Sequence, residues 1–212
     1  MGDFLKKTCY IFAAGDFEGS FEKREGDLLI AADAGFHHLK KLGISPDILL
    51  GDFDTIGEIP KHENTLVFPA EKDYTDTELA IMEGIRRGFG SFMIFGALGG
   101  KRLEHTIANI ALASGYAERG YEVTLSDGNY YVASLHDSCL EFDEKQKGFV
   151  SVFPYLNAAK GVSIRGLKYP LENATLDSSN PTLCVSNEFI GKRAEISVSD
   201  GTVIIIWQKS KD

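Results

Sequence analysis

The spacing of hydrophobic residues changes character near residue 135. Before that point, short runs that are apolar at every position alternate with segments whose apolar residues recur every three or four positions. Continuous apolar runs predict strands covered on both faces, and the recurring spacing predicts amphipathic helices. The predicted strand segments are CYIFAAG (9–15), DLLIAADAG (27–35), PDILLGDFD (46–54), TLVFP (65–69), SFMIFGALGG (91–100) and YEVTLSDG (121–128).

Helices are predicted between these strands. The first, FHHLKKLG (36–43), ends at Gly43, and Pro46 keeps it from resuming. The second extends from Asp76 to about Arg87. Strands that alternate with helices indicate an α/β N-terminal domain with a mostly parallel, Rossmann-like sheet. The residues at helical spacing in the second and third helices are Leu79, Met82, Ile85, Ile107, Ile110, Ala111 and Ser114.

The rest of the chain lacks the helical period and consists of short alternating segments separated by turn signals. This texture is typical of antiparallel strands and predicts an all-β sandwich as C-terminal domain. SDG (199–201) is predicted as a hairpin turn and DEKQKG (143–148) as an exposed link. We therefore expect domains at 1–135 and 136–212. The predicted strands are FVSVFPY (149–155), GVSIRG (161–166), PTLCVSN (181–187), RAEISVSDG (193–201) and TVIIIW (202–207).

Composition narrows the possible partners and location. The chain has 212 residues and a net charge of -9, which argues against general affinity for nucleic acid or an anionic membrane. The longest apolar run, VIIIW (203–207), is far too short to span a bilayer, and the start lacks the apolar stretch of a signal peptide, so a cytoplasmic location is expected. The cysteines lack metal-ligand spacing and are predicted to be buried: Cys9, Cys139 and Cys184.

Two carboxylates follow the third predicted strand. If the strand continues, Asp52 and Asp54 project to the same side while Phe53 points to the other. Aspartates are also common in turns and at helix N-termini, so a structural role is an equal alternative. As a pair on one face they repel, and a divalent cation such as magnesium would compensate them.

A second acidic segment, EKDYTDTELAI (71–81), opens the second predicted helix. Thr75 and Glu78 have the spacing of a capping box, which alone accounts for the threonine and part of the acidity. The capping box does not explain Asp73 and Asp76 beside Lys72. Asp76, in the first helical turn, could join the aspartate pair around one cation.

The third such segment, GALGGKRLEHTIANI (96–110), is a glycine-rich turn from a strand into a helix. Free N–H groups at a helix start suit phosphate, and glycine allows close approach of the backbone. The segment matches neither of the common nucleotide-binding glycine patterns, so taken alone it is a weak signature. Its histidine, His105, is either a phosphate donor or a polar residue at the helix start.

Taken together, these motifs resemble the thiamine pyrophosphokinase family. Family members transfer a diphosphate from ATP to thiamine, and the resemblance implies an α/β nucleotide domain, a C-terminal β-sandwich, a homodimer and a requirement for Mg²⁺. It implies a single step in which the thiamine hydroxyl attacks the β-phosphorus and AMP leaves. The motifs that carry the resemblance are ADAG (32–35), PDILLGDFDTI (46–56), KDYTDTELAI (72–81), GALGGKRLEHTIANI (96–110), GLKYPLENATL (166–176) and SNEFIG (186–191).

The resemblance also implies roles for individual residues. It assigns magnesium to Asp52, Asp54 and Asp76, and one of these or Asp73 would accept the hydroxyl proton. It places the ATP contacts at Asp33, Lys72, Thr75, Gly99, Gly100, Lys101, Arg102 and His105. It places thiamine near Ser186, Asn187 and Glu188, with Tyr169 or Trp207 as candidates to stack on it. The chain departs from the family pattern at Ala34, where a glycine is frequent, and at Glu104, where an aspartate is frequent.

Two other functions fit part of the sequence. DFDT (52–55) loosely resembles the D-x-D nucleophile motif of haloacid-dehalogenase-like phosphatases, in which Asp52 would be phosphorylated, although those enzymes carry the motif on their first strand. A thiamine or nucleotide sensor that has lost catalysis is the second alternative. Retention of the paired aspartates disfavours it, because a protein that only binds has little need of them.

Overall fold

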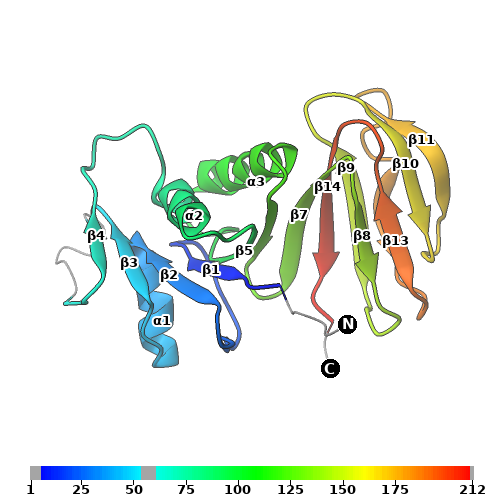
Figure 1. Cartoon of the computed structure of the whole chain (residues 1–212). Coiled ribbons are helices and arrows are strands. Elements are labelled where there is room, and N and C mark those ends of the chain that lie inside the picture. The colour runs from blue at the N-terminus through cyan, green and yellow to red at the C-terminus, as the bar shows by residue number, and fades with distance from the viewer. Residues whose placement is uncertain (1–5, 54–60, 211–212) are drawn as a thin grey trace. The chain divides into compact units, whose positions relative to one another are not determined.

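The structure of the chain is a computed structural model, shown in Figure 1, and it describes residues 6–53 and 61–210. The chain divides into two compact units. The first unit comprises residues 1–109 and 125–128, and the second comprises residues 110–124 and 129–212. Helix α3 (Leu103–Glu118) and strand β6 (Glu122–Ser126) carry the chain between the units. Asp54, one of the predicted metal ligands, lies outside the described residues.

A parallel sheet forms the centre of the first unit. Its strands lie in the order β5-β1-β2-β3-β4, and each pairs in parallel with its neighbours, as the continuous apolar runs predicted. This order brings the carboxyl ends of the strands, and the polar loops that follow them, to one edge of the sheet. The strands are β1 (Cys9–Phe12), β2 (Leu28–Ala32), β3 (Ile48–Gly51), β4 (Thr65–Val67) and β5 (Ser91–Phe95).

The two faces of this sheet are covered by different helices (Figure 1). Helix α1 (Phe36–Leu42) places Leu39 in the cluster around Phe12, and Gly43 ends the helix in the left-handed conformation, as predicted. Helix α2 (Asp76–Arg86) packs through Gly84 against the other face, because a Cβ at Gly84 would lie 3.0 Å from Cys9 Sγ. Both faces of the strands are therefore buried.

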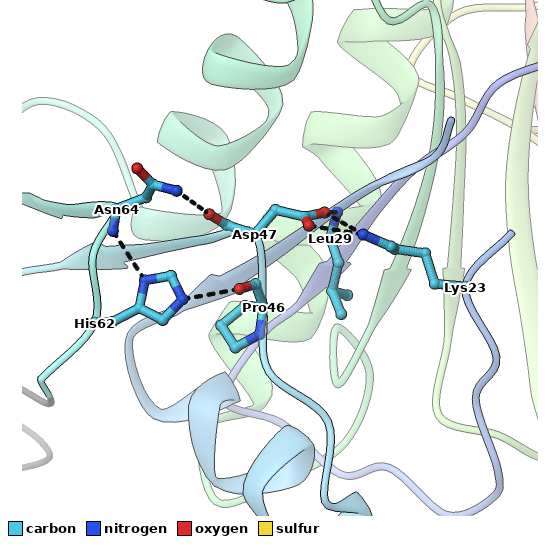
Figure 2. A network of polar contacts seen from close by, with 6 residues as sticks. All are labelled: Lys23, Leu29, Pro46, Asp47, His62 and Asn64. Carbon is cyan, nitrogen blue, oxygen red and sulfur yellow. Dashed lines mark hydrogen bonds and ion pairs between the residues drawn. The ribbon is translucent and has the colours of Figure 1, made fainter. Parts of the chain in front are cut away.

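A polar network fixes the start of β3, the strand that leads to Asp52 (Figure 2). The Asp47 carboxylate accepts a hydrogen bond from the Leu29 N–H at 2.7 Å. Both of its oxygens also accept from Lys23 Nζ, at 2.7 and 2.8 Å. Asn64 Nδ2 donates to the Asp47 carbonyl, and His62 Nε2 lies 2.8 Å from the Pro46 carbonyl. These contacts join β2, β3 and the start of β4. The register of β3 against its neighbours, which positions Asp52, is therefore set by side-chain contacts as well as by the backbone hydrogen bonds between the strands.

The second unit holds two antiparallel sheets around one core. One sheet contains the run β12-β9-β14-β7, and the other has the order β11-β10-β13-β8. Val152 and Ile205 from the first sheet and Ile164 and Ile196 from the second belong to a single buried cluster, so the sheets pack face to face. The strands are β7 (Tyr130–His136), β8 (Cys139–Phe142), β9 (Phe149–Pro154), β10 (Ala159–Arg165), β11 (Leu171–Leu176), β12 (Cys184–Glu188), β13 (Ala194–Ser197) and β14 (Thr202–Gln208).

The predicted hairpin at 199–201 is wrong. Strand β13 pairs with β10 and β8, whereas β14 pairs with β7 and β9, so residues 198–201 carry the chain from one sheet to the other. The turn signal is real, but the strands on its two sides bury their apolar residues in opposite walls of the core. Strands β7, β8 and β11 were not predicted.

The buried faces of α2 and α3 also differ from the prediction. In α2 the buried residues are Thr77, Ala80, Ile81 and Gly84, and the predicted core residue Met82 is exposed. In α3, Ile107 is exposed. Helical spacing alone does not say which face of a helix points inward, so the buried positions can be offset from the apolar ones. The buried residues of α3 are Asn109, Ala113, Ser114, Tyr116 and Ala117.

The cysteine prediction holds for two of the three residues. Cys9 and Cys184 are buried, but Cys139, at the start of β8, is exposed. Among the described residues, no helix is both long and apolar enough to cross a membrane.

Candidate functional site

A cavity of about 530 Å³ opens at the carboxyl edge of the parallel sheet. All of its lining residues belong to the first unit. They come from the segments after β1, β2, β3 and β5 and from the starts of α2 and α3, as expected for a sheet whose strand ends meet at one edge. The predicted site residues among them are Asp33, Asp52, Thr75, Asp76, Gly99, Gly100, Lys101, Arg102 and His105.

Asp33 and Asp52 are brought together by the close packing of β2 and β3. Asp33 begins the short helix η1 (Asp33–Gly35) with a φ of 44°, and a Cβ on Gly51 would lie 3.1 Å from its Cα. Strand β3 ends at Gly51, and Phe53 has a φ of 60° and a buried side chain. The alternation expected along residues 52–54 is therefore interrupted at Phe53.

Lys72 joins the carboxylates of Asp52 and Asp76. Its Nζ lies 3.0 Å from Asp52 Oδ2 and 2.9 Å from Asp76 Oδ1. Burial works against the charged form of Lys72, but the contacts with the two aspartates outweigh it and raise the lysine pKa. Lys72 does not line the cavity and supports two residues that do.

The acidic wall of the cavity has more negative charge than Lys72 alone can balance. Burial raises the pKa of Asp76; the contact with Lys72 opposes this, and the charges of Asp52 and Asp33 add to it. Asp33 Oδ1 is buried and accepts no hydrogen bond from the described residues. A buried carboxylate oxygen that accepts no hydrogen bond is suited to binding a cation. Within residues 6–53 and 61–210, however, no group of three or more His, Cys, Asp or Glu is arranged to hold a metal ion.

Thr75 fixes the start of α2 at the cavity. Its Oγ1 accepts the Glu78 N–H at 3.2 Å, which confirms that half of the predicted capping box. The cap sets the orientation of Asp76, the first residue of the helix. Asp73 is exposed and does not line the cavity.

The glycine-rich turn also lines the cavity. Gly99 and Gly100 have φ values of 68° and 83°, a region that favours glycine, and they lead directly to Lys101 and Arg102. Asp16, on the segment after β1, also lines the cavity, and its Oδ2 accepts the Gly100 N–H at 2.7 Å. Sequence reasoning missed Asp16, although it follows a predicted strand in the same way as the other site aspartates.

In the second unit, Asn187 and Tyr169 form a close pair. Asn187 is 3% exposed, and its amide bonds to both backbone polar groups of Tyr169, while the Tyr169 side chain is 60% exposed. A register shift in β12 between Cys184 and Asn187 accompanies this placement of Asn187. A buried asparagine therefore holds an exposed tyrosine.

The other predicted thiamine residues of the second unit have different surroundings. Ser186 has a φ of 58° and an exposed side chain, and Glu188 pairs with Lys168 Nζ at 2.7 Å. Trp207 stacks on Tyr131 and meets Phe142 edge-on, so it packs against the core of this unit.

Comparison with known proteins agrees with this two-part arrangement. The profile described as "Thiamin pyrophosphokinase, catalytic domain" matches residues 22–125, and that described as "Thiamin pyrophosphokinase, vitamin B1 binding domain" matches residues 138–203. Thiamine pyrophosphokinase of Bacillus subtilis (strain 168) is 32% identical over 213 residues, covering 94% of this chain and 98% of the relative. The chain belongs to the thiamine pyrophosphokinase family.

Solved structures of thiamine pyrophosphokinases share the fold over nearly the whole chain. The crystal structure of the Bacillus subtilis protein has a TM-score of 0.83 at 26% identity and covers 97% of this chain and 100% of its own. That of the Geobacillus thermodenitrificans protein has a TM-score of 0.77 at 26% identity, with coverage of 97% and 98%. The thiamine pyrophosphokinase fold therefore accounts for both units of this chain.

Proposed function

We propose that this chain binds ATP in the cavity of the first unit and thiamine through the second unit, and transfers a diphosphate between them. Membership of the thiamine pyrophosphokinase family makes the chain a thiamine diphosphokinase, which forms thiamine diphosphate from thiamine. We assign ATP to domain 1–135 and thiamine to domain 136–212, in keeping with the matches at 22–125 and 138–203.

The ATP assignment rests on one observation: acidic and glycine-rich segments from separate strand ends line the same cavity. Gly99 and Gly100 allow close approach of a polyphosphate, and Lys101 and Arg102 beside them offset its charge. His105 can donate to a phosphate oxygen, as can the hydroxyl of Thr75. Asp33 lies at the end of β2, where a parallel sheet exposes groups to its ligand.

Asp52 and Asp76, together with Asp54, are the residues that would hold Mg²⁺. The fit is supported by the carboxylate donor set, by Asp33 Oδ1, which accepts no hydrogen bond from residues 6–53 and 61–210, and by the raised pKa of Asp76, caused first by burial. When bound, Mg²⁺ supplies charge neutralisation to the polyphosphate. Lys72 pairs with both described aspartates and keeps their side chains oriented.

The reaction itself requires positioning more than covalent chemistry. The thiamine hydroxyl attacks the β-phosphorus in line with the leaving AMP, and its proton passes to one carboxylate among Asp52, Asp54, Asp76 and Asp73. Of these, Asp52 and Asp76 line the cavity.

Tyr169, Ser186 and Glu188 supply the thiamine side of the proposal. The exposed Tyr169 ring can stack on an aromatic ligand, and Glu188 and the Ser186 hydroxyl can accept hydrogen bonds from an aminopyrimidine. Asn187 already bonds to Tyr169, so we assign it a supporting role. Trp207 packs against the core, which favours Tyr169 as the stacking residue.

We also propose that the chain works as a homodimer in the cytoplasm. Support for association comes from Leu103 and Ile107, which are one helical turn apart on α3 and 71% and 62% exposed. A second copy that packed against this helix face would bury both apolar side chains. Sedimentation or light scattering of the purified protein tests this proposal.

The deciding experiment incubates the purified protein with ATP, Mg²⁺ and thiamine and identifies both products. We expect AMP and thiamine diphosphate in equal amounts, and no AMP when thiamine is omitted. Release of inorganic phosphate with a trapped phosphoaspartate would instead favour the phosphatase, in which Asp52 is the nucleophile. Binding of both ligands without any product would favour the sensor.

A further inference from the structure

Asp16 binds the glycine-rich turn of the cavity through its side chain. Asp16 Oδ2 accepts the Gly100 N–H at 2.7 Å, an interaction between residues 84 positions apart in the chain. The contact therefore links the segment after β1 to the turn after β5.

The segment that carries Asp16 is itself anchored. The Gly15 N–H donates to the Gly96 carbonyl at 2.7 Å, and the Asp16 N–H donates to the Leu98 carbonyl at 3.2 Å. On its other side, His38 Nε2 lies 2.8 Å from the Gly15 carbonyl. Asp16 is thus presented by a fixed backbone.

The same backbone bonds hold the first part of the turn, at Gly96 and Leu98, and Thr106 Oγ1 donates to the Gly99 carbonyl at 3.4 Å. Gly99 and Gly100 both adopt positive φ values, and glycine loses more conformational freedom on ordering than any other residue. A Cβ on Gly99 would lie 2.7 Å from Asp16 Oδ2, so the carboxylate is seated against the turn backbone. The carboxylate restrains the two residues that have the greatest freedom.

We propose that Asp16 is a positioning residue for ATP: its carboxylate orders the Gly99–Gly100 turn in the conformation that receives the polyphosphate. This inference rests on the proposed ATP site. Asp16 acts as an acceptor for the Gly100 N–H, and its negative charge, on the wall that carries Lys101 and Arg102, is not needed for the effect. The acceptor and charge contributions can be separated by substitution.

Two substitutions at Asp16 test the proposal. Asp16→Ala removes the acceptor, and we expect the KM for ATP to rise about tenfold while the KM for thiamine and kcat change less than about twofold. Asp16→Asn keeps an oxygen that can accept the Gly100 N–H, and we expect an ATP KM equal to or below that of the unmodified protein. Glu18→Ala is the matched control, because Glu18 is an exposed acidic residue of the same segment that does not line the cavity.

Hydrogen exchange provides a readout that does not need turnover. Amide exchange at Gly100 should accelerate in Asp16→Ala and remain slow in Asp16→Asn. An unchanged exchange rate and ATP KM in Asp16→Ala would overturn the proposal. Equal losses in Asp16→Ala and Asp16→Asn would also overturn it, since they would show that the charge is what matters.

Failure of the proposed function has a different signature. In that case the unmodified protein forms no thiamine diphosphate, whereas exchange at Gly100 and direct titration with ATP still report on Asp16. Loss of ATP binding in the unmodified protein would remove the site itself, and with it the role given to Asp16.

Discussion

Asn187 bonds to Tyr169 at both of its backbone polar groups: Nδ2 donates to the Tyr169 carbonyl at 2.7 Å, and Oδ1 accepts the Tyr169 N–H at 3.0 Å. Oδ1 also accepts the Glu188 N–H at 2.9 Å. The exposed tyrosine is therefore held by a side chain that is almost wholly buried. A ligand that stacks on a side chain whose backbone is already fixed loses less free energy in ordering that segment.

Replacing Asn187 with alanine should weaken thiamine binding without affecting ATP. The Tyr169 segment loses two hydrogen bonds, and we expect the KM for thiamine to rise about tenfold and the free energy of unfolding to fall by about 2–3 kcal/mol. Steady-state kinetics with each substrate varied, together with urea unfolding, measure both effects. If Asn187 acts through Tyr169, then Asn187→Ala adds little to Tyr169→Ala in the double variant; full additivity contradicts the mechanism.

Replacing Asp52 with asparagine should abolish most turnover and leave the fold intact. The change keeps the size of the side chain but removes a charge from the proposed magnesium site, so we expect kcat to fall about 100-fold or more. The same change at Asp54 should act alike. Product formation and the Mg²⁺-dependent shift in Tm are the measurements, with Asp200→Asn as an exposed control. Turnover like that of the unmodified protein would falsify the metal assignment.

Glu83 makes stability depend on pH. Hydrogen bonds from Arg86 and Arg87 hold the pKa of Glu83 below its ordinary value of 4.5, although burial opposes them. A lowered pKa in the folded state means that this stabilisation is present above pH 4.5 and is lost as the pH falls through the folded-state pKa.

Glu83→Gln should therefore lower the free energy of unfolding by about 1 kcal/mol at pH 7. Urea unfolding at a series of pH values should show the difference shrinking below pH 4.5. A difference that is constant with pH would indicate altered packing of α2 instead of a lost charge interaction.

The cysteines should react at very different rates. Burial raises the pKa of the Cys9 and Cys184 thiols, which lowers the fraction of reactive thiolate, whereas Cys139 is exposed. A thiol reagent should modify one residue quickly in the native protein and all three cysteines after unfolding. Cys139→Ser should remove the fast phase, and a fast phase that survives this change contradicts the assignment.

The sequence was most informative at the ends of the parallel strands. Asp33, Asp52 and Gly99 each follow a continuous apolar run, and the rule that such ends meet at one edge was enough to gather them. The pairing of Lys72 with both Asp52 and Asp76 was not predictable, because it depends on where α2 begins relative to β3.

The second unit was predicted less completely. Alternating segments indicated strands, but the assignment of β13 and β14 to different sheets depends on tertiary packing and has no local signal. Asn187 has the same limitation: within SNEFIG it has no feature that distinguishes a ligand contact from a backbone clamp. Only the register shift in β12 and the approach of Tyr169 define its role.

The cavity takes all of its lining from the first unit, while Asn187 and Tyr169 belong to the second. If ATP binds in the first unit and thiamine through the second, as proposed, mutations that alter nucleotide preference and mutations that alter vitamin preference can accumulate in separate stretches of the gene. Under selection, a change of phosphate donor need not disturb the recognition of the acceptor.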